Sequence, residues 1–367
     1  MKKGMKKILK YLGIIVLIVL VLLLAYIIYL FASYHRIPDN QPLQVEQTKE
    51  SISSGDTLTT EKEYSALTYN IGFGAYTPDF SFFMDGGKSS WAKSKESVKK
   101  TVQSAGELVA SKDPDFALIE EVDLNSTRSY HVDEYSILKE TIPSYNTVFA
   151  QNYDSAFLFY PLNQPHGKSR SGLALFSKYP VTDSLRRSFP VSTSFSKFFD
   201  LDRCYSVHRI PVASGGELVL YNLHLSAYTS DGTIAMEQLK LLLEDMQREY
   251  DAGNWCVAGG DFNKDLLGDS AAYFGEADQE YTWAQPIPED TFDGFNVSLI
   301  APLDEGNPVP SCRNADAPYH EGQYVLTVDG FVVSDNVTVE QVVVEDTGFA
   351  WSDHNPCLLY TSDAADE

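Results

Sequence analysis

An uninterrupted apolar run near the N-terminus is the feature that most constrains this chain. Residues Tyr11–Ala32 carry no charge and consist mostly of Leu, Ile and Val. About 20 apolar residues in a helix cross the hydrocarbon layer of a bilayer. Since the core helices of soluble proteins rarely need so long an unbroken run, the sequence predicts a transmembrane helix over residues 11–32.

The flanks of this run predict an uncleaved anchor and its orientation. A signal peptide has a shorter apolar core and a cleavage site of small residues, and Phe31-Ala32-Ser33-Tyr34 matches such a site poorly. Residues 1–10 form a basic segment with five lysines, and no acidic residue precedes Asp39. Because positive charge stays on the cytoplasmic side, we expect a single-pass protein of the cell membrane, with its N-terminus in the cytoplasm and everything after Ser33 outside the cell.

The charge of the remaining chain limits its partners. The whole chain has 28 basic and 51 acidic residues, so that without the five N-terminal lysines 23 basic residues remain and the net charge is −28. Such a domain repels polyanions unless a metal ion or a local basic patch compensates. This argues against avid nonspecific binding of nucleic acid, but not against turnover of a phosphodiester. The four cysteines show no metal-binding CxxC spacing.

The chain after the anchor divides into a linker and one domain of mixed strands and helices. Residues 33–62 are polar and aperiodic, which predicts a flexible stalk. Residues 63–360 follow without a second linker and predict two packed sheets flanked by helices. The predicted strands are Tyr64–Ile71, Asp115–Val122, Leu173–Phe176, Tyr205–Val212, Leu218–Leu225 and Trp255–Ala258, with a hairpin formed by Val325–Ser334 and Val337–Val344 around Asp335-Asn336. Helices are predicted through Val98–Val109, ending near Lys112, and over Ile234–Tyr250.

The last residues have an unusual composition. Residues 357–367 resemble translated sequencing-library adapter rather than natural protein. On this hypothesis the domain is truncated after Pro356 and lacks a final core strand. Genomic reads across the junction test it, and uninterrupted coverage to a natural stop codon would contradict it.

Polar side chains repeatedly follow apolar strands, where a buried sheet would bring them to one rim. A single strand-end Asn, Asp or His is most often a turn former or a structural residue, but here the pattern recurs along the whole domain. The residues are Asn70, Glu121, His224, Asp261, Asn263, Asp329, Asp353 and His354.

These residue types suit the chemistry of phosphoesters. Mg²⁺ prefers carboxylate and amide oxygens and keeps waters for substrate phosphate, which Glu121, Asp353 and Asn70 would suit. A histidine held by a carboxylate, as His354 by Asp329, keeps one tautomer and stabilises the imidazolium. Hydrolysis of a phosphoester needs a positioned and deprotonated water, stabilised phosphoryl charge and an assisted leaving group.

The ordered motifs resemble the endonuclease/exonuclease/phosphatase superfamily, as a membrane-anchored bacterial-type member. They span residues 66–356 in the family's order. The motifs are Thr68-Tyr69-Asn70-Ile71, Ile119-Glu120-Glu121-Val122-Asp123, Ser171-Gly172-Leu173-Ala174, Asn222-Leu223-His224-Leu225, Gly259-Gly260-Asp261-Phe262-Asn263, Val328-Asp329-Gly330-Phe331 and Ser352-Asp353-His354-Asn355-Pro356.

The resemblance implies a fold, a cofactor and residue roles. The implied fold is an α/β four-layer sandwich of two mixed β-sheets flanked by helices, and the implied cofactor is Mg²⁺ or Mn²⁺. Asn70, Glu121 and Asp353 look like metal-site residues. Asp261 and Asn263 would hold the nucleophilic water and phosphate, and His224 would bind phosphate or aid the leaving group. Asp329 and His354 would form an acid/base pair, with Asp261 and His354 both open as the general base.

Three local features depart from the family's pattern. Glu120 stands where the family usually has Gln, and Gly330 stands where nucleases commonly have a large residue. Pro310-Ser311-Cys312-Arg313 only faintly resembles the phosphoinositide-phosphatase signature, because it lacks the acidic-arginine pair. Lys168 and Arg170, in a basic loop, are candidate substrate contacts, as is the pair Arg186-Arg187.

Metal-dependent hydrolysis of a phosphoester outside the cell is the function that these observations favour. Three substrates stay open: nucleic acid, a phospholipid headgroup and a small phosphorylated metabolite. The bilayer is a partner through the N-terminal helix. The alternative is a catalytically inactive surface binding module of the same fold, against which the full set of site residues argues.

Overall fold

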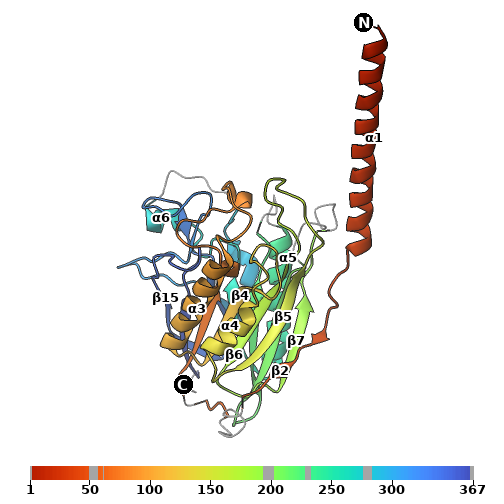
Figure 1. Cartoon of the computed structure of the whole chain (residues 1–367). Helices are drawn as coiled ribbons and strands as arrows, with labels where there is room; N and C mark the ends of the chain where they lie inside the picture. The colour runs from red at the N-terminus through yellow and green to blue at the C-terminus, as the bar shows by residue number, and fades with distance from the viewer. Residues whose placement is uncertain are drawn as a thin grey trace.

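Two mixed β-sheets packed face to face form the centre of the molecule, and helices cover their outer faces (Figure 1). The computed structural model describes residues 2–48, 57–60, 62–192, 202–227, 233–275 and 283–363. The helices are α1 (Lys2–Ser33), α3 (Lys95–Lys112), α4 (Glu134–Thr141), α5 (Thr233–Asp251) and α6 (Ser270–Phe274), with single turns η1 (Gly72–Gly74), η2 (Phe83–Asp85) and η4 (Glu289–Phe292). This confirms the predicted fold class.

The first sheet has the strand order β1-β7-β8-β9-β10-β14-β11. Its strands are β1 (Gln41–Pro42), β7 (Asp183–Ser188), β8 (Cys204–Pro211), β9 (Glu217–His224), β10 (Trp255–Asp261), β14 (Asp329–Ser334) and β11 (Val297–Ile300). The pair β9 and β10 is parallel, and the other pairs are antiparallel.

The second sheet has the order β15-β16-β3-β4-β6-β5-β2. Its strands are β15 (Val337–Val344), β16 (Cys357–Asp363), β3 (Tyr64–Asn70), β4 (Phe116–Asp123), β6 (Arg170–Ser177), β5 (Asn146–Asp154) and β2 (Val45–Glu46). The pair β3 and β4 is parallel. A short ribbon of β12 (Cys312–Arg313) and β13 (Val325–Leu326) completes the described strands.

Three apolar clusters hold these layers together. One lies between the second sheet and the helices α3 and α4, with Val102 and Leu138 at its centre. Another joins the first sheet to α5 through Leu239 and Leu243. The third, which includes Leu118 and other side chains of both sheets, fills the space between them. Because each sheet is buried on both faces, polar side chains are delivered to its edges and strand ends.

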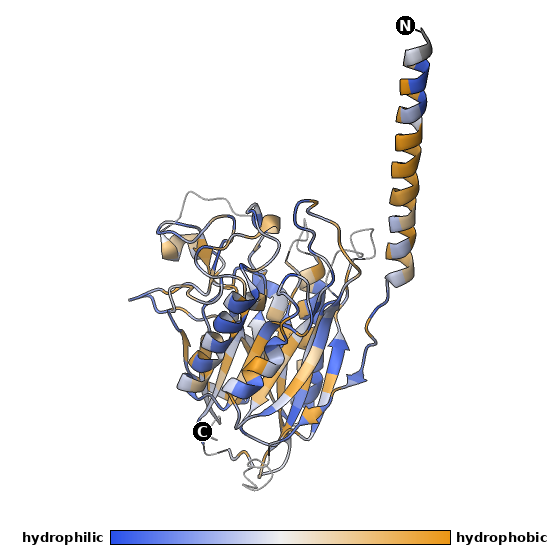
Figure 2. Cartoon of the chain, viewed as in Figure 1, coloured by the Kyte–Doolittle hydropathy of each residue, from blue (hydrophilic) through white to orange (hydrophobic). Residues whose placement is uncertain are grey.

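The helix α1 is the one described helix long and apolar enough to cross a membrane, judged by length and composition. It contains the predicted span of residues 11–32 and begins earlier, in the basic segment. Figure 2 shows its apolar middle and polar start, and the helix rises away from the domain. Its exposed apolar surface has no protein to pack against over most of its length.

The predicted stalk is wrong in its described part. Residues 41–46 add β1 to the edge of the first sheet and β2 to the edge of the second. Leu43 and Val45 pack against the apolar cluster between the sheets. The segment is polar overall, but its few apolar side chains are spaced to reach this interior, and two strand edges were available for pairing. Residues 49–56 and 61 of the predicted stalk lie outside the described residues.

The predicted hairpin around Asp335-Asn336 is also wrong. Strand β14 lies between β10 and β11 in the first sheet, whereas β15 pairs with β16 in the second. The chain crosses from one sheet to the other at this turn. Sheet membership depends on partners far away in sequence, which adjacent strands do not reveal.

Residues Cys357–Asp363 form strand β16, and the adapter origin of residues 357–367 stays a prediction. Strand β16 pairs with β3 on one side and β15 on the other. Cys357, Leu358 and Leu359 are buried in the core. All four cysteines are free and buried.

A buried arginine holds the beginning of the segment that was predicted as a stalk. Arg186 is 0% exposed. Its guanidinium donates to the carbonyl oxygens of Pro38 at 3.2 Å, Gln151 at 2.7 Å and Asp202 at 2.9 Å. Arg186 is therefore structural and does not contact a substrate, while Arg187 pairs with Asp245 at 2.8 Å.

We expect Arg186→Met to destabilise the domain strongly. Removing this charge leaves the carbonyl oxygens of Pro38, Gln151 and Asp202 without this donor, a loss of about 3–5 kcal/mol. Thermal unfolding of the full chain in detergent measures the change, and limited proteolysis should cut residues 35–46 faster. The control is Lys139→Met, which removes the exposed pair with Glu46 and should cost about 1 kcal/mol or less. Equal effects of the two substitutions would contradict this role.

Candidate active site

The ends of four central strands meet at one rim of the sandwich. Asn70 ends β3, His224 ends β9 and Asp261 ends β10. Glu121 lies near the end of β4. Because β3 runs parallel to β4 and β9 runs parallel to β10, the ends of each pair come together at this rim.

One polar pocket at this rim gathers the predicted residues. Asn70, Glu121, His224, Asp261, Asn263, Asp353 and His354 line it. Asp329 is buried behind His354. The structure therefore brings together all eight residues for which catalytic or metal-binding roles were predicted, and the roles themselves stay predictions.

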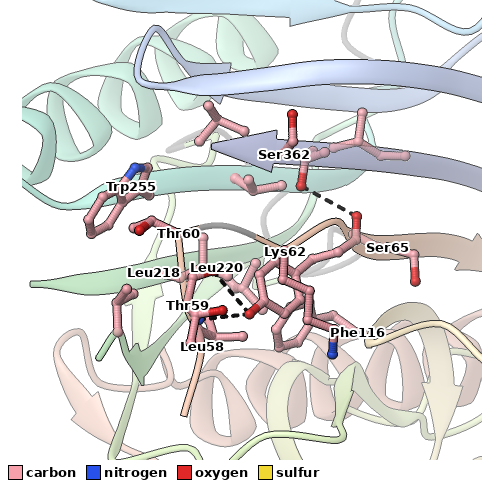
Figure 3. A pocket seen from close by; sticks show the side chains of 17 residues that line it. Leu58, Thr59, Thr60, Lys62, Ser65, Phe116, Leu218, Leu220, Trp255 and Ser362 are labelled. Carbon is pink, nitrogen blue, oxygen red and sulfur yellow. Dashed lines mark hydrogen bonds between the residues drawn. The ribbon is translucent and has the colours of Figure 1, made fainter. Parts of the chain in front are cut away.

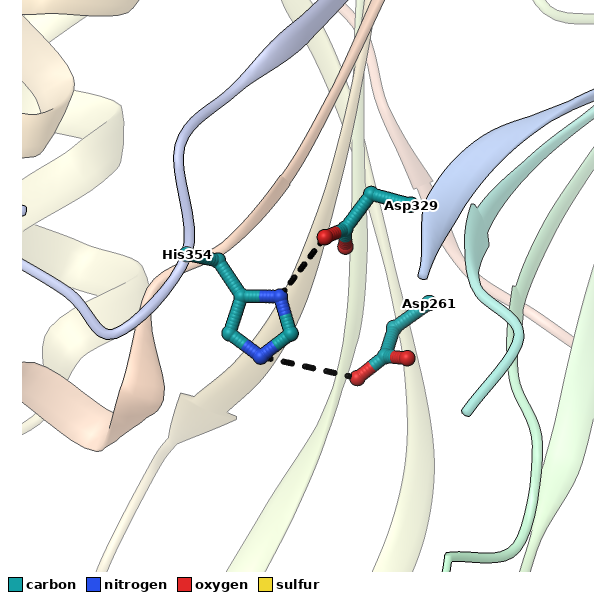
Figure 4. A group of neighbouring side chains, drawn as sticks. All are labelled: Asp261, Asp329 and His354. Carbon is teal, nitrogen blue, oxygen red and sulfur yellow. Dashed lines mark hydrogen bonds and ion pairs between the residues drawn. The ribbon is translucent and has the colours of Figure 1, made fainter. Parts of the chain in front are cut away.

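An Asp–His–Asp group lies at the base of the pocket (Figure 4). The Nδ1 atom of His354 is 2.7 Å from the Oδ2 atom of Asp329. Its Nε2 atom points to Asp261, 3.8 Å from Oδ2. The hydroxyl of Ser311 donates to the same oxygen of Asp329 at 2.7 Å. With one ring nitrogen held by a carboxylate, the other is directed into the pocket.

Asp261 is the centre of a second set of contacts. The side-chain amide of Asn70 donates to its Oδ2 atom at 3.1 Å, and the Nε2 atom of His224 lies 3.4 Å from the same oxygen. The backbone N–H of Asn263 donates to Oδ1 at 2.8 Å. These donors orient the carboxylate, so that it faces His354 across the pocket.

Burial and neighbouring charges set the protonation of these groups. Burial raises the pKa of Asp261 to about 7, with His354 opposing and Asp329 adding to the rise. Burial would lower the pKa of His354, but the carboxylate of Asp329 outweighs it and holds the pKa well above its usual value. Burial and then the charge of Arg203 lower the pKa of His224 well below its usual value. The site thus holds a neutral imidazole beside an imidazole that readily takes a proton.

Glu121, Asp353 and Asn70 fit a hard divalent cation. The first two bring carboxylates into one pocket. Burial raises the pKa of Asp353, against the charges of His354 and Arg313, and the charge of Glu121 raises it further. Carboxylate and amide oxygens are the ligands that Mg²⁺ and Mn²⁺ bind, and here the Nη1 atom of Arg128 lies 3.8 Å from the Oε2 atom of Glu121.

A second group of possible ligands consists of Asp261, Asp329 and His354, whose ligand atoms lie within 4.8 Å of one another. In this group the short contact between His354 and Asp329 is a hydrogen bond through Nδ1, which leaves Nε2 as the ring nitrogen with a lone pair for a metal. The assignment of the cation to Glu121, Asp353 and Asn70 stays a prediction.

The surroundings of Glu120 favour its protonated, neutral form. It is fully buried, and the hydroxyl of Thr68 donates to its Oε1 atom at 3.1 Å. Burial and then the charge of Asp329 raise its pKa well above the usual value. A protonated carboxyl has the shape and neutrality of a Gln side chain, so in that form Glu120 adds no negative charge beside Glu121.

Gly330 is required by its surroundings. A Cβ atom at this position would lie 2.7 Å from Leu266 Cδ1 and 3.0 Å from the carbonyl oxygen of Ile300. The large residue common in nucleases does not fit here unless these neighbours move.

Two buried arginines in the pocket have no predicted role. Arg203 and Arg313 line it. Arg313 donates through Nη1 to the carbonyl oxygen of Asn314 at 3.1 Å, and its Nε atom has no partner among the described residues. Arg313 stands in a sequence that only faintly resembles a phosphatase signature, and no motif was recognised in the sequence before Arg203. The signal that could have found them is chemical: a site for phosphate is expected to contain arginine.

Lys168 and Arg170 do not line this pocket. Lys168 lies 3.6 Å from the carboxylate of Asp154, and Arg170 donates to the side chain of Gln151 at 3.2 Å. Substrate contact by these two residues stays a prediction.

A separate apolar pocket lies at the opposite ends of the strands (Figure 3). Leu58, Leu218, Trp255 and Phe116 line it. It holds no titratable group of the site described above.

Comparison with known proteins places these observations in a family. A sequence model of the Endonuclease/Exonuclease/phosphatase family matches residues 67–354. No curated protein sequence matches the chain significantly.

Several solved structures share the fold at low sequence identity. An endonuclease/exonuclease/phosphatase from Beutenbergia cavernae DSM 12333 is 16% identical with a TM-score of 0.56, over 82% of this chain and 72% of that chain. ANGEL2, a 2',3'-cyclic phosphatase, is 15% identical with a TM-score of 0.55, over 88% of this chain and 98% of that one. The human Nocturnin catalytic domain with bound sulfate anion is 15% identical with a TM-score of 0.53, over 88% and 98%. At these identities the likeness concerns the fold alone.

We expect Glu120→Gln to keep the fold and to remove a pH-dependent loss of folding stability. The folded chain holds the proton of Glu120 above the usual pKa of 4.5, whereas the unfolded chain releases it, so stability falls as pH rises between the two values. Thermal unfolding in EDTA should show the variant more stable than the parent near pH 8, with little difference near pH 4. A gain that is the same at both pH values would contradict a protonated Glu120.

Proposed function

The chain belongs to the endonuclease/exonuclease/phosphatase family, and we propose that it hydrolyses a phosphoester by attack of water at phosphorus. The observation that carries the proposal is the buried group of His354, Asp329 and Asp261 beside acidic side chains in one polar pocket. Members of the family are phosphoester hydrolases, and the matched region contains every residue of this group. The alternative, a catalytically inactive binding module, is disfavoured, because such a module would not need the complete set of predicted site residues.

Asp329, His354 and Asp261 would handle the proton. Asp329 accepts from Nδ1 of His354 and so fixes the tautomer in which Nε2 faces the pocket. A water between Nε2 of His354 and the carboxylate of Asp261 would have two groups able to accept its proton. The 3.8 Å between these atoms leaves both as candidates for the general base.

Phosphate binding would come from cationic and amide donors around the same pocket. Arg203 and Arg313 carry positive charge into its lining, and His224 presents a neutral imidazole. The side-chain amide of Asn263 is held by the carbonyl oxygen of Leu225 at 2.9 Å. Such donors stabilise the charge that develops on phosphoryl oxygens during attack.

The predicted metal residues are Glu121, Asp353 and Asn70, with Mg²⁺ or Mn²⁺ as the cation. Bound there, a divalent cation would neutralise charge on the phosphoryl group and on the leaving oxygen. Asn70 would serve two purposes, because its amide nitrogen also orients Asp261.

The location follows from the N-terminal segment. The lysine-rich start and the apolar helix favour an N-terminus in the cytoplasm and a catalytic domain outside the cell, because positive charge stays on the cytoplasmic side. The substrate would then be an extracellular phosphoester.

We expect the full chain in detergent to hydrolyse bis(p-nitrophenyl) phosphate with Mg²⁺ and to lose this activity in EDTA. His354→Ala should lower kcat/KM at least about 100-fold, the size expected for loss of acid–base catalysis. Asp329→Asn should also lower it, because an amide favours the wrong tautomer of His354.

The matched control is His131→Ala, since His131 is exposed and its side chain hydrogen bonds only to Asn125 among the described residues. It should keep the parent rate. Metal-independent turnover, or equal activity of the His354→Ala and His131→Ala variants in folded protein, would contradict the proposed function.

A further inference from the structure

The loop that joins β5 to β6 carries an exposed apolar surface. Phe159 is 50% exposed, Tyr160 68% and Leu162 86%. Residues 155–169 contain no acidic residue, although the chain has 51. A loop of this composition is unusual on so acidic a domain, and large exposed apolar side chains that gather in one place mark an interaction surface.

This loop contacts the membrane-spanning helix directly. The hydroxyl of Tyr26 donates to the carbonyl oxygen of Phe157 at 3.2 Å, and the N–H of Phe157 donates to the hydroxyl of Tyr29 at 2.9 Å. The rings of Tyr26 and Phe159 pack edge to face, with centroids 5.0 Å apart. The loop and the last turns of α1 are therefore at the same height.

That height corresponds to the boundary of the bilayer. With about 20 residues needed to cross the hydrocarbon, a span that starts at Tyr11 ends near Leu30. Tyr26 then lies about 6 Å inside this boundary, at a rise of about 1.5 Å per residue. Tyrosines concentrate at the membrane–water interface, and the contacts of Tyr26 and Tyr29 place the loop at this level.

The same surface continues to the mouth of the active site. The ring of Tyr160 packs against that of Phe83 in η2, with centroids 5.8 Å apart. Met84 is 51% exposed, and the next residue, Asp85, lines the polar pocket. Figure 1 shows α1 rising from the end of the domain that carries these loops.

We propose that Met84, Phe157, Phe159, Tyr160 and Leu162 form a membrane-contact surface in the bilayer that α1 crosses, and that the substrate is a phosphoester in a lipid headgroup. The chemistry rests on the proposed function. The oxygen of water bonds to phosphorus, the bond from phosphorus to the leaving oxygen breaks, and a proton from the water ends on that leaving oxygen. With the pocket at the interface, the headgroup enters it while the acyl chains stay in the bilayer.

The charge of the surface favours lipid over the other substrates. A nucleic acid would require a basic surface at the pocket mouth, whereas the exposed side chains of Phe159, Tyr160 and Leu162 are apolar. The basic residues at the end of this loop, Lys168 and Arg170, do not line the pocket. A small soluble ester would need no apolar surface beside the pocket.

Spin labelling tests the membrane contact. All four native cysteines are buried, so a nitroxide can be attached selectively to Leu162→Cys in the full chain. The control is Tyr360→Cys, since Tyr360 is 36% exposed and pairs with Ser65 at the start of β3, away from the pocket. In vesicles of phosphatidylcholine and phosphatidylglycerol, the label at position 162 should collide with oxygen in preference to a nickel chelate, at a ratio several-fold higher than at position 360.

A ratio of oxygen to nickel-chelate collisions at position 162 that is typical of a water-exposed site would contradict the membrane contact. Poor collision with both reagents would show that protein covers the loop, for example a second copy of the chain, and would overturn it as well.

Turnover tests the substrate class. In the same vesicles, Phe159→Ser combined with Leu162→Asn should lower the release of water-soluble phosphate products from lipid at least tenfold. Hydrolysis of bis(p-nitrophenyl) phosphate should stay within twofold of the parent, and Tyr360→Ser should change neither rate.

The outcomes separate this inference from the proposed function. Turnover of the soluble ester without turnover of lipid by the parent chain would overturn the lipid substrate and leave the hydrolase intact. Turnover of neither ester would overturn the proposed function, and the spin label would still decide on the membrane contact.

Discussion

The hydrogen bond between His354 and Asp329 is the contact on which the site depends, and it joins the two sheets. Asp329 starts β14 in the first sheet, whereas His354 lies just before β16 of the second. A second bond across the same interface runs from Asn70 of β3 to Asp261 of β10. The geometry of the pocket therefore exists only when the sheets pack in register, so the apolar cluster between them supports the chemistry as well as stability.

The backbone at the rim is held in uncommon conformations that aim these side chains. Glu121 and Asn263 have positive φ angles of 54° and 49°, which cost energy outside glycine and persist where surrounding structure enforces them. At Gly260, φ is +155°, and a Cβ atom would lie 1.9 Å from the carbonyl oxygen of Leu223. Only glycine allows β10 to approach β9 this closely beside Asp261. Glu121 and Asn263 both line the pocket, although residues outside it, such as Asn40 and Asp113, also have positive φ angles.

The features that could be predicted from the sequence are those that local hydrophobic periodicity and short motifs determine. The helices α3 and α5 and the central strands β3, β4 and β9 followed from their periodicity, and the ordered motifs identified the residues that meet at the rim. The hairpin around Asp335-Asn336 and the stalk were wrong because pairing with distant strand edges decided both. Arg203 and Arg313 were missed as pocket residues because no local pattern shows which loop folds over a site. The buried environment that keeps Glu120 neutral likewise depends on Asp329, which is distant in sequence.

The position of the incoming oxygen tests the central claim most directly. The full chain with Mg²⁺ would hydrolyse its phosphoester in ¹⁸O-labelled water, and mass spectrometry would locate the label in the products. Attack of water at phosphorus, arranged by His354, Asp329 and Asp261, predicts one ¹⁸O atom in the phosphate product of each turnover and none in the released alcohol. Label in the alcohol would show cleavage at carbon and would contradict the account.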